Sequence, residues 1–281
     1  MKIHHLNCGC MCPAGGALYD GFSRGLKAKL ICHCLLIETD RDGLVLVDTG
    51  FGHKDMQAPA TTLSPFFRAI NNIQRNTSLT ALSQIQALGF DAADVRHIIL
   101  THLDFDHAGG ISDFPHARVH LMEEEINTAR QRHSWLTTQR YRPAQWGGIS
   151  GWQGYRATGE KWFGFDAVNQ LNGLPPDILM IPLAGHTTGH AGIAIRTTSG
   201  WTLHGGDAWF FRGEMHQAQR NCTPGLRFYQ WFMAQDNKAR RLNQQRLREL
   251  SCTHPEELTL FCSHDALEFE RVAATKPSTS Y

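Results

Sequence analysis

The stretch THLDFDHAGG (residues 101–110) follows the apolar run VRHIIL and contains three side chains suited to bind metal, His102, Asp106 and His107. Asp104 places a further carboxylate between them. In an extended or tightly turning segment alternate residues face one side, so His102 and Asp104 can converge, whereas the adjacent Asp106 and His107 can diverge toward a second centre. The spacing therefore predicts two neighbouring metal positions at the end of a strand.

Three later segments repeat the same arrangement, in which an apolar run ends and a metal-capable residue follows at once. MIPLAG precedes His186, TLHGG precedes Asp207, and LTLFCS precedes His264. A single His after a strand, or a single Asp in a turn, is usually structural. Strand ends at one edge of a sheet converge in space, however, so the four segments together predict one metal centre held by rigid elements. Imidazole and carboxylate ligands without thiolate suit zinc, manganese, iron or cobalt rather than calcium.

These motifs resemble the signature of the metallo-β-lactamase-fold superfamily, which is HxHxDH, a His in a GHTxGH-like turn, an Asp after a strand and a final His. The chain reads HLDFDH, AGHTTGH, GGD and SHD, and LVLVDTG (44–50) resembles the early hairpin end of the family. The sequences of these motifs are most similar to those of the N-acyl-homoserine lactonase branch. The resemblance runs from about residue 30 to 265 and implies an α/β fold, a four-layer αβ/βα sandwich with metals at one edge of the two sheets.

The resemblance also implies a role for each ligand position. The first metal is then held by His102, Asp104 and His186, the second by Asp106, His107 and His264, and Asp207 bridges the two. Asp48 and His190 are expected to support the ligands rather than to bind metal.

The function implied is that of a dinuclear metal-dependent hydrolase, in which a metal-bridging hydroxide cleaves a small ester or lactone and Asp106 orients the hydroxide. We expect two divalent ions, with zinc as the first choice and manganese or iron as alternatives. Two other activities of the same fold stay open, a diiron oxidoreductase, because its motif HxExDH also has a carboxylate at the second position, and a phosphodiesterase. A binding protein without activity is disfavoured because every ligand position is filled by a competent residue.

Asp104 stands where the common motif has a third histidine. Its charge would make the sum over two divalent ions, three carboxylates and a hydroxide zero, which predicts a preference for neutral substrates and for harder metals. On the same argument, Asp104→His should restore the common ligand set. A second departure is Phe210, since the lactonases carry a tyrosine three residues after the bridging Asp. Tyr141, Tyr155 and Tyr229 are candidates to replace it.

Composition limits the class of protein. The 281 residues are 42% hydrophobic and 19% charged, with a formal net charge of +1, which suits a globular chain with a small-molecule substrate and predicts no nucleic-acid partner. No apolar run approaches the length of about 18 residues that spans a membrane, and the first residues lack a signal-peptide core, so we expect a cytoplasmic protein. The sequence alone does not indicate an oligomeric state.

The cysteines in CGCMC and ICHC alternate, which favours apolar residues on one face of a strand over a zinc knuckle.

The pattern of apolar residues predicts one domain, residues 1–281, of layered α/β type. Residues 30–39 and 44–48 predict a hairpin, and residues 78–90 predict a helix that leads into a strand at 95–100. Between about 131 and 176 the periodicity disappears and Trp, Tyr and Gly become frequent, so we expect an irregular insert that forms a lid or pocket wall. Further strands are predicted at 117–122, 177–183, 192–197, 201–207 and 258–262, with helices starting at 123 and covering 234–250.

Overall fold

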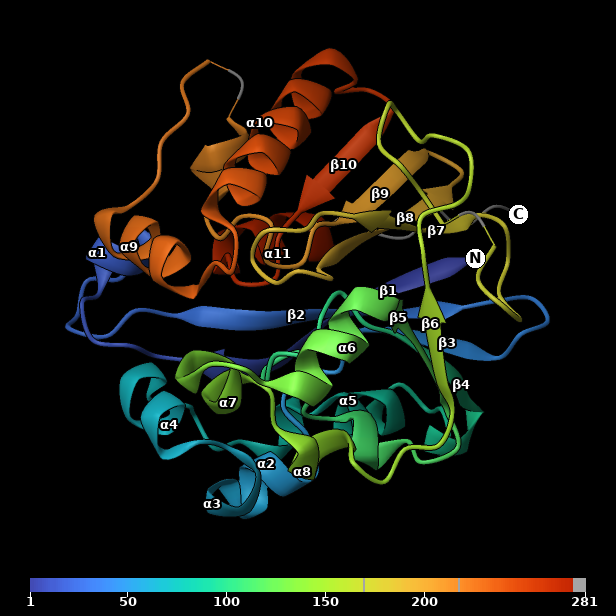
Figure 1. The fold of residues 1–281 in the computed structure, drawn as a ribbon, viewed down its shortest axis with the longest axis horizontal. Helices are drawn as coiled ribbons and strands as arrows, with labels where there is room; N and C mark the ends of the chain where they lie inside the picture. The colour runs from blue at the N-terminus through green and yellow to red at the C-terminus, as the bar shows by residue number, and fades with distance from the viewer. Residues whose placement is uncertain (169, 217, 275–281) are drawn as a thin grey trace.

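The structure, a computed structural model, describes residues 1–168, 170–216 and 218–274. Two sheets pack face to face with helices on both outer sides (Figure 1), which confirms the predicted αβ/βα sandwich. The first sheet has the strand order β1-β2-β3-β4-β5-β6 and the second β10-β9-β8-β7. The strands of the first sheet are β1 (Lys2–Met11), β2 (Leu30–Glu38), β3 (Leu44–Val47), β4 (Val95–Ile99), β5 (Arg118–Met122) and β6 (Trp152–Tyr155); those of the second are β7 (Ile178–Pro182), β8 (Ala191–Thr197), β9 (Gly200–His204) and β10 (Leu258–Phe261).

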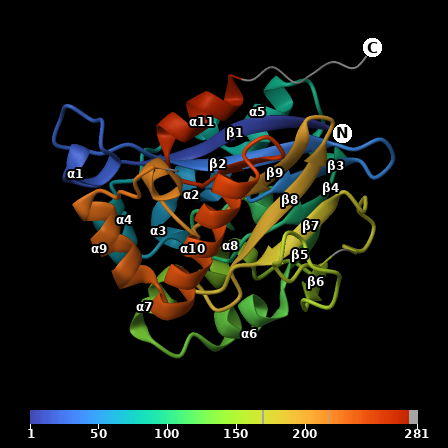
Figure 2. The ribbon, with the colours of Figure 1, turned by 90° about the horizontal axis from the view of Figure 1, so that it is seen from above.

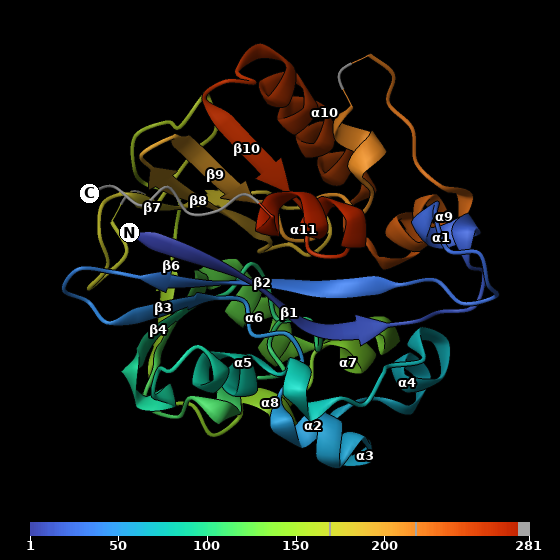
Figure 3. The ribbon, with the colours of Figure 1, turned by 180° about the vertical axis from the view of Figure 1, so that it is seen from behind.

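Helices cover the outer face of each sheet. Helices α5 and α6 lie below the first sheet and α10 lies on the far side of the second, whereas α11 lies between β10 of the second sheet and β1 and β2 of the first (Figures 1 and 3). Figure 2, turned by 90°, shows α1, α4, α7 and α9 together at one end of the molecule. The helices are α1 (Ala17–Asp20), α2 (His53–Gln57), α3 (Pro59–Thr62), α4 (Pro65–Asn71), α5 (Ala81–Ala87), α6 (Glu123–Gln131), α7 (Trp135–Arg140), α8 (Pro143–Trp146), α9 (Pro224–Met233), α10 (Asn237–Thr253) and α11 (Ala266–Ala273), with 3-10 turns η1 (Thr77–Leu79), η2 (Ala92–Asp94), η3 (Ile111–Asp113) and η4 (Arg212–Met215).

Strand β2 shows why the sequence forms this sandwich. Its residues are apolar at nearly every position because both faces are covered. Leu35 and Ile37 pack against the second sheet, whereas Cys34 and Leu36 pack with Ile85 of α5. A strand with this period of two buries one set of side chains between the sheets and the other under the helices. Each fully buried Leu or Ile side chain contributes about 2 kcal/mol relative to exposure.

Most elements lie where the sequence predicts them. The hairpin is confirmed, with β2 antiparallel to β3, and so are the strands β4, β5, β7, β8, β9 and β10 and the helices α5, α6 and α10. The insert at 131–176 is more regular than expected, because it contains α7, α8 and β6, and β6 pairs in parallel with β5. Short elements with Gly and Trp lack the periodicity on which the prediction relied.

The cysteines of β1 do not share one face as the alternation predicts. A bulge between Asn7 and Cys10 shifts the register of β1 against β2, so Cys8 is buried whereas Cys10 is only partly buried. An extra residue in one strand reverses the faces of those that follow it. All eight cysteines are free thiols. Within the described part of the chain, no helix is both long enough and apolar enough to cross a membrane.

Candidate metal centre

The segment 101–110 is a loop after β4 whose backbone is fixed by buried side chains. The Asp48 carboxylate accepts hydrogen bonds from the backbone N–H of Thr101 at 2.8 Å and from its hydroxyl at 2.8 Å. Glu125 of α6 accepts from the N–H of Leu103 at 3.0 Å through Oε1 and from the Thr187 hydroxyl at 2.6 Å through Oε2. Glu125 therefore connects this loop to the turn that carries His186.

Two glycines allow backbone segments to approach closely here. A Cβ at Gly109 would lie 2.2 Å from Oδ2 of Asp55. Gly206 has a φ of 55°, and a Cβ there would lie 2.6 Å from Nε2 of His190. Neither place has room for a side chain, and the positive φ at Gly206 also favours glycine.

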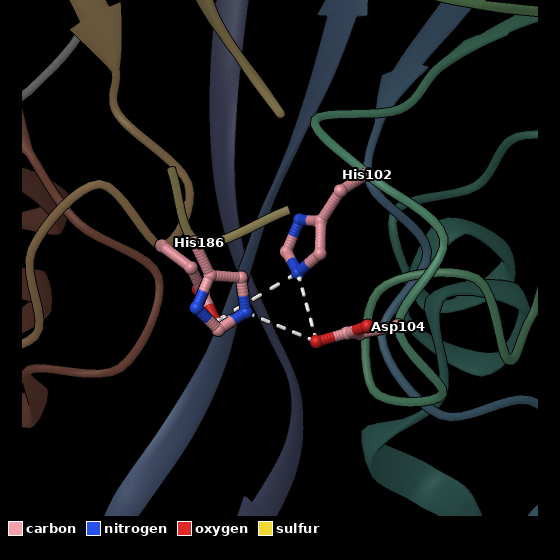
Figure 4. Close-up of side chains that lie close together, drawn as sticks. His102, Asp104 and His186 are labelled. Carbon is pink, nitrogen blue, oxygen red and sulfur yellow. Dashed lines mark hydrogen bonds and ion pairs between the residues drawn. The ribbon is translucent and has the colours of Figure 1, made fainter. Parts of the chain in front are cut away.

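A first group of possible ligands forms where the loop after β4 meets the turns after β7 and β9. His102, Asp104, His186 and Asp207 are all buried, and each offers a ligand atom within 4.8 Å of the others. Oδ2 of Asp104 lies 3.0 Å from Nε2 of His186 and 3.4 Å from Nε2 of His102. Figure 4 shows these three side chains pointing toward one another from separate segments.

A second group lies beside the first. His107, Asp207 and His264 bring their ligand atoms within 4.8 Å, and so do Cys32, Asp106 and His264. Oδ1 of Asp207 lies 3.0 Å from Nε2 of His264 and 3.3 Å from Nε2 of His107. Its Oδ2 lies 3.3 Å from Nε2 of His186. The two oxygens of Asp207 thus face different groups, which is the arrangement that a bridging carboxylate requires.

In His107 and His264 the ring nitrogen that faces away from the centre has a partner. Nδ1 of His107 lies 2.8 Å from the Asp48 carboxylate, and Nδ1 of His264 lies 2.6 Å from the carbonyl of Ile31. Such partners fix the tautomer and leave Nε2 for a metal. His190 accepts the N–H of Asp207 at 2.9 Å. Asp48 and His190 therefore contact the candidate ligands His107 and Asp207, and their supporting role at a metal stays a prediction.

Burial and mutual attraction set the charges of this cluster. Burial alone would raise the pKa of Asp207, but His264, His107 and His186 hold it well below its ordinary value. Burial, together with the neighbouring His107, lowers the pKa of His102 to about 4. Nε2 of His102 makes no hydrogen bond among the described residues. A buried neutral imidazole with an unused lone pair, beside ionised carboxylates, fits a divalent cation.

Arg140, at the end of α7, contacts Asp104 directly. Its Nε donates to Oδ1 of Asp104 at 2.6 Å, and Nη2 donates to Oδ2 at 2.5 Å. The expectation of a centre with zero net charge is therefore wrong, because it omits this guanidinium, whose positive charge offsets that of Asp104. Burial alone would lower the pKa of Arg140, but Asp104 raises it, so the side chain stays charged.

The three candidate tyrosines have different surroundings. The Tyr155 hydroxyl lies 2.8 Å from Nδ1 of His120, on strands β5 and β6. Tyr141 accepts a hydrogen bond from Gln235 at 3.3 Å. Tyr229 of α9 packs against Phe210, with ring centroids 5.6 Å apart, and burial together with Asp106, Asp207 and Asp104 raises its pKa well above the ordinary value. Burial and Asp104 also raise the pKa of Tyr141, but Asp106, Asp207 and Asp104 all raise that of Tyr229.

Sequence reasoning missed three residues at this centre. No spacing signal singles out Arg140, although a buried Asp104 needs a positive or hydrogen-bonding partner. Cys32 was predicted to be an apolar strand residue, yet its sulfur lies in the second group. Glu125 stands in the first turn of α6, and no motif marks it, yet it is buried and connects two loops. From the insert, Gln145 also contacts the metal loop, donating to the carbonyl of Phe105 at 2.9 Å.

Comparisons with known proteins agree with this geometry. The family model of the metallo-beta-lactamase superfamily matches residues 29–264. A probable metallo-hydrolase from Mycobacterium tuberculosis is 39% identical over 265 residues, which cover 94% of this chain and 80% of that protein. An N-acyl homoserine lactonase from Bacillus thuringiensis is 25% identical over 130 residues, 44% of this chain and 52% of that protein. A solved N-acyl homoserine lactone hydrolase with product at its catalytic metal centre has a TM-score of 0.72 at 20% identity, covering 96% of this chain and 95% of that one.

Proposed function

The chain belongs to the metallo-beta-lactamase superfamily and is a metal-dependent hydrolase, and we propose that two divalent ions act at its centre to cleave a small ester or lactone. The observation that carries the proposal is the position of Asp207, whose Oδ1 lies 3.0 Å from His264 and whose Oδ2 lies 3.3 Å from His186. A carboxylate shared in this way supports a two-metal assignment over a single ion. The proposed ligands are His102, Asp104, Asp106, His107, His186, Asp207 and His264.

The chemistry divides between the ions and the side chains. Two bound divalent ions would supply hydroxide near neutral pH and polarise a carbonyl oxygen. Asp106 is part of the second group, with Oδ2 3.6 Å from Nε2 of His264. Burial raises the pKa of Asp106, which suits a carboxylate that accepts and returns a proton through Oδ2.

Support for an ester or lactone substrate comes from the relatives and from Tyr229. Lactonases are among the proteins that this chain resembles in sequence and in fold. Phe210 stacks on His264 with centroids 5.0 Å apart, and Tyr229 packs on Phe210. We propose that the Tyr229 hydroxyl supplies the hydrogen bond to the substrate carbonyl that a tyrosine at position 210 would otherwise donate.

The net charge of the centre does not favour a neutral ester or lactone over an anionic substrate, because the positive charge of Arg140 offsets the negative charge of Asp104. Anionic phosphodiesters therefore belong in the test beside neutral substrates. The experiment is a panel of neutral lactones, neutral esters and phosphodiesters, assayed with Zn²⁺ and with Mn²⁺. Preference for lactones or esters, lost in Asp207→Ala, supports the proposal. Cleavage of phosphodiesters alone would contradict it.

Tyr229→Phe tests the substrate contact. Loss of a hydrogen bond to the developing charge should lower kcat/KM for a lactone by about 100- to 1,000-fold, with unchanged metal content. Tyr155→Phe is the matched control, since it removes a buried hydroxyl bonded to His120, and it should leave kcat/KM near the wild-type value. Equal activity of Tyr229→Phe and the wild type would rule out this role for the hydroxyl.

A further inference from the structure

Arg140 is held in one orientation by contacts on three sides. Its side chain is fully buried. Nε and Nη2 bind the two oxygens of Asp104 in parallel, at 2.6 and 2.5 Å, and Nη1 donates to the carbonyl of Met233 at 2.8 Å. This paired geometry uses the planar fork of the guanidinium, which a lysine cannot reproduce. Arg140 is therefore a buried and rigidly held part of the centre.

In the pair of Asp104 and Arg140, one carboxylate oxygen of Asp104 faces the candidate histidine ligands. Oδ2 of Asp104 faces the ring nitrogens Nε2 of His186, at 3.0 Å, and of His102, at 3.4 Å. Nη2 of Arg140 also lies 2.8 Å from Nε2 of His186. Because Nε2 has a single lone pair, an ion bound there takes it, and Nη2 then keeps its bond to Asp104 alone.

We propose that Asp104 and Arg140 together form one composite ligand that takes the place of the third histidine of the common motif. Asp104 supplies the ligand atom, and Arg140 fixes the carboxylate and cancels its charge. The first metal position is then surrounded by groups of the same net charge as in the all-histidine arrangement. The inference rests on the two-metal function proposed above.

A direct consequence concerns Asp104→His, which the sequence alone predicts to restore the common ligand set. In the folded protein this substitution removes the partner of Arg140 and leaves a buried positive charge beside the first metal position. The cation should then bind on the order of 100-fold more weakly at that position. Adding Arg140→Gln removes the positive charge, so the double variant should recover the ion that the single variant loses.

Four proteins test the composite ligand. They are the wild type, Asp104→His, Asp104→His with Arg140→Gln, and Asp104→His with Arg142→Gln. Arg142 is the matched control because it lies two residues away and donates to the carbonyl of Thr62 at 2.8 Å rather than to the centre. Bound Zn²⁺ per chain is measured by equilibrium dialysis with elemental analysis, and affinity by competition with a chromophoric chelator.

The expected counts are two ions for the wild type, one for Asp104→His, two for the variant that also lacks Arg140, and one for the Arg142 control. Two tightly bound ions in Asp104→His alone would overturn the proposal. So would an Asp104→His, Arg140→Gln protein that binds no more than Asp104→His does.

Folding is followed by thermal melting of the metal-free proteins. If Asp104→His fails to fold, recovery of a cooperative transition and of two ions in the double variant supports the proposal, and a double variant that also fails to fold contradicts it. A wild type that binds fewer than two ions contradicts the two-metal function as well. A two-ion wild type without rescue in the double variant contradicts only the composite ligand.

Discussion

Asp48→Asn tests whether Asp48 fixes the tautomer of His107 at the second metal position. The Asp48 carboxylate accepts from the N–H of Thr101, from the Thr101 hydroxyl and from Nδ1–H of His107, each at 2.8 Å. Asp48 has a φ of 52°, a left-handed conformation that asparagine also tolerates. The amide can keep the bond from the N–H of Thr101 through Oδ1. Its NH2 group then faces His107, so Nδ1 must accept and the ring proton moves to Nε2.

Such a tautomer places a proton on the atom that faces the metal. Changes to partners of this kind typically cost 10- to 100-fold in metal affinity, about 1.4 to 2.7 kcal/mol. We therefore expect the second position to weaken by that factor and the first to stay unchanged, as measured by competition with a chromophoric chelator. Asp113→Asn is the control, since Asp113 accepts from the N–H of His53 at 2.9 Å, outside the centre. Equal affinities in Asp48→Asn and the wild type would refute the reasoning.

Two predictions concern buried glutamates in the metal-free protein. Burial raises the pKa of Glu268 from 4.5 to about 7, so the folded state binds more protons between those values and the free energy of unfolding should fall as pH rises from about 5 to 7, by up to roughly 3 kcal/mol. Glu268→Gln should make this slope shallower in urea titrations, with a remainder from Asp55, whose pKa burial raises to about 6, whereas the exposed Glu270→Gln should retain it; a wild-type slope in Glu268→Gln would contradict the assignment. Glu125→Gln should lower the free energy of unfolding by about 1 to 3 kcal/mol, because the amide cannot accept at both ends the bonds from Leu103 and Thr187. The exposed Glu124→Gln should change it by less than about 0.5 kcal/mol, and equal effects of the two substitutions would show that Glu125 does not join the loops.

The parts of the fold that the sequence predicts well are those with a regular apolar period. β2 and β3, for example, are apolar enough to be recognised on their own, and their pairing follows from the short turn between them. The bulge in β1 is different, because an extra residue in one strand is visible only when its partner is known. The short α7, α8 and β6 carry too few periodic residues for prediction.

The candidate centre likewise contains residues that the sequence predicts and others that it does not. Residues such as His102 and Asp207 stand in a recognisable order after strands, and the structure brings them together. Arg140 stands in a segment without any metal motif, and only tertiary packing brings its guanidinium to Asp104. The charge of a buried site therefore cannot be counted from its ligands alone. Any neighbour that enters the same low-dielectric volume belongs to the sum.

The number of ions that activity requires is the most direct test of the central claim. Metal-free protein is titrated with Zn²⁺ while bound metal and hydrolysis of a neutral lactone or ester are followed in the same samples. We predict that activity develops fully only as the second ion binds, and that Asp207→Ala neither holds two ions nor reaches wild-type activity. Full activity with one bound ion per chain, or an active Asp207→Ala protein with two, would contradict the account.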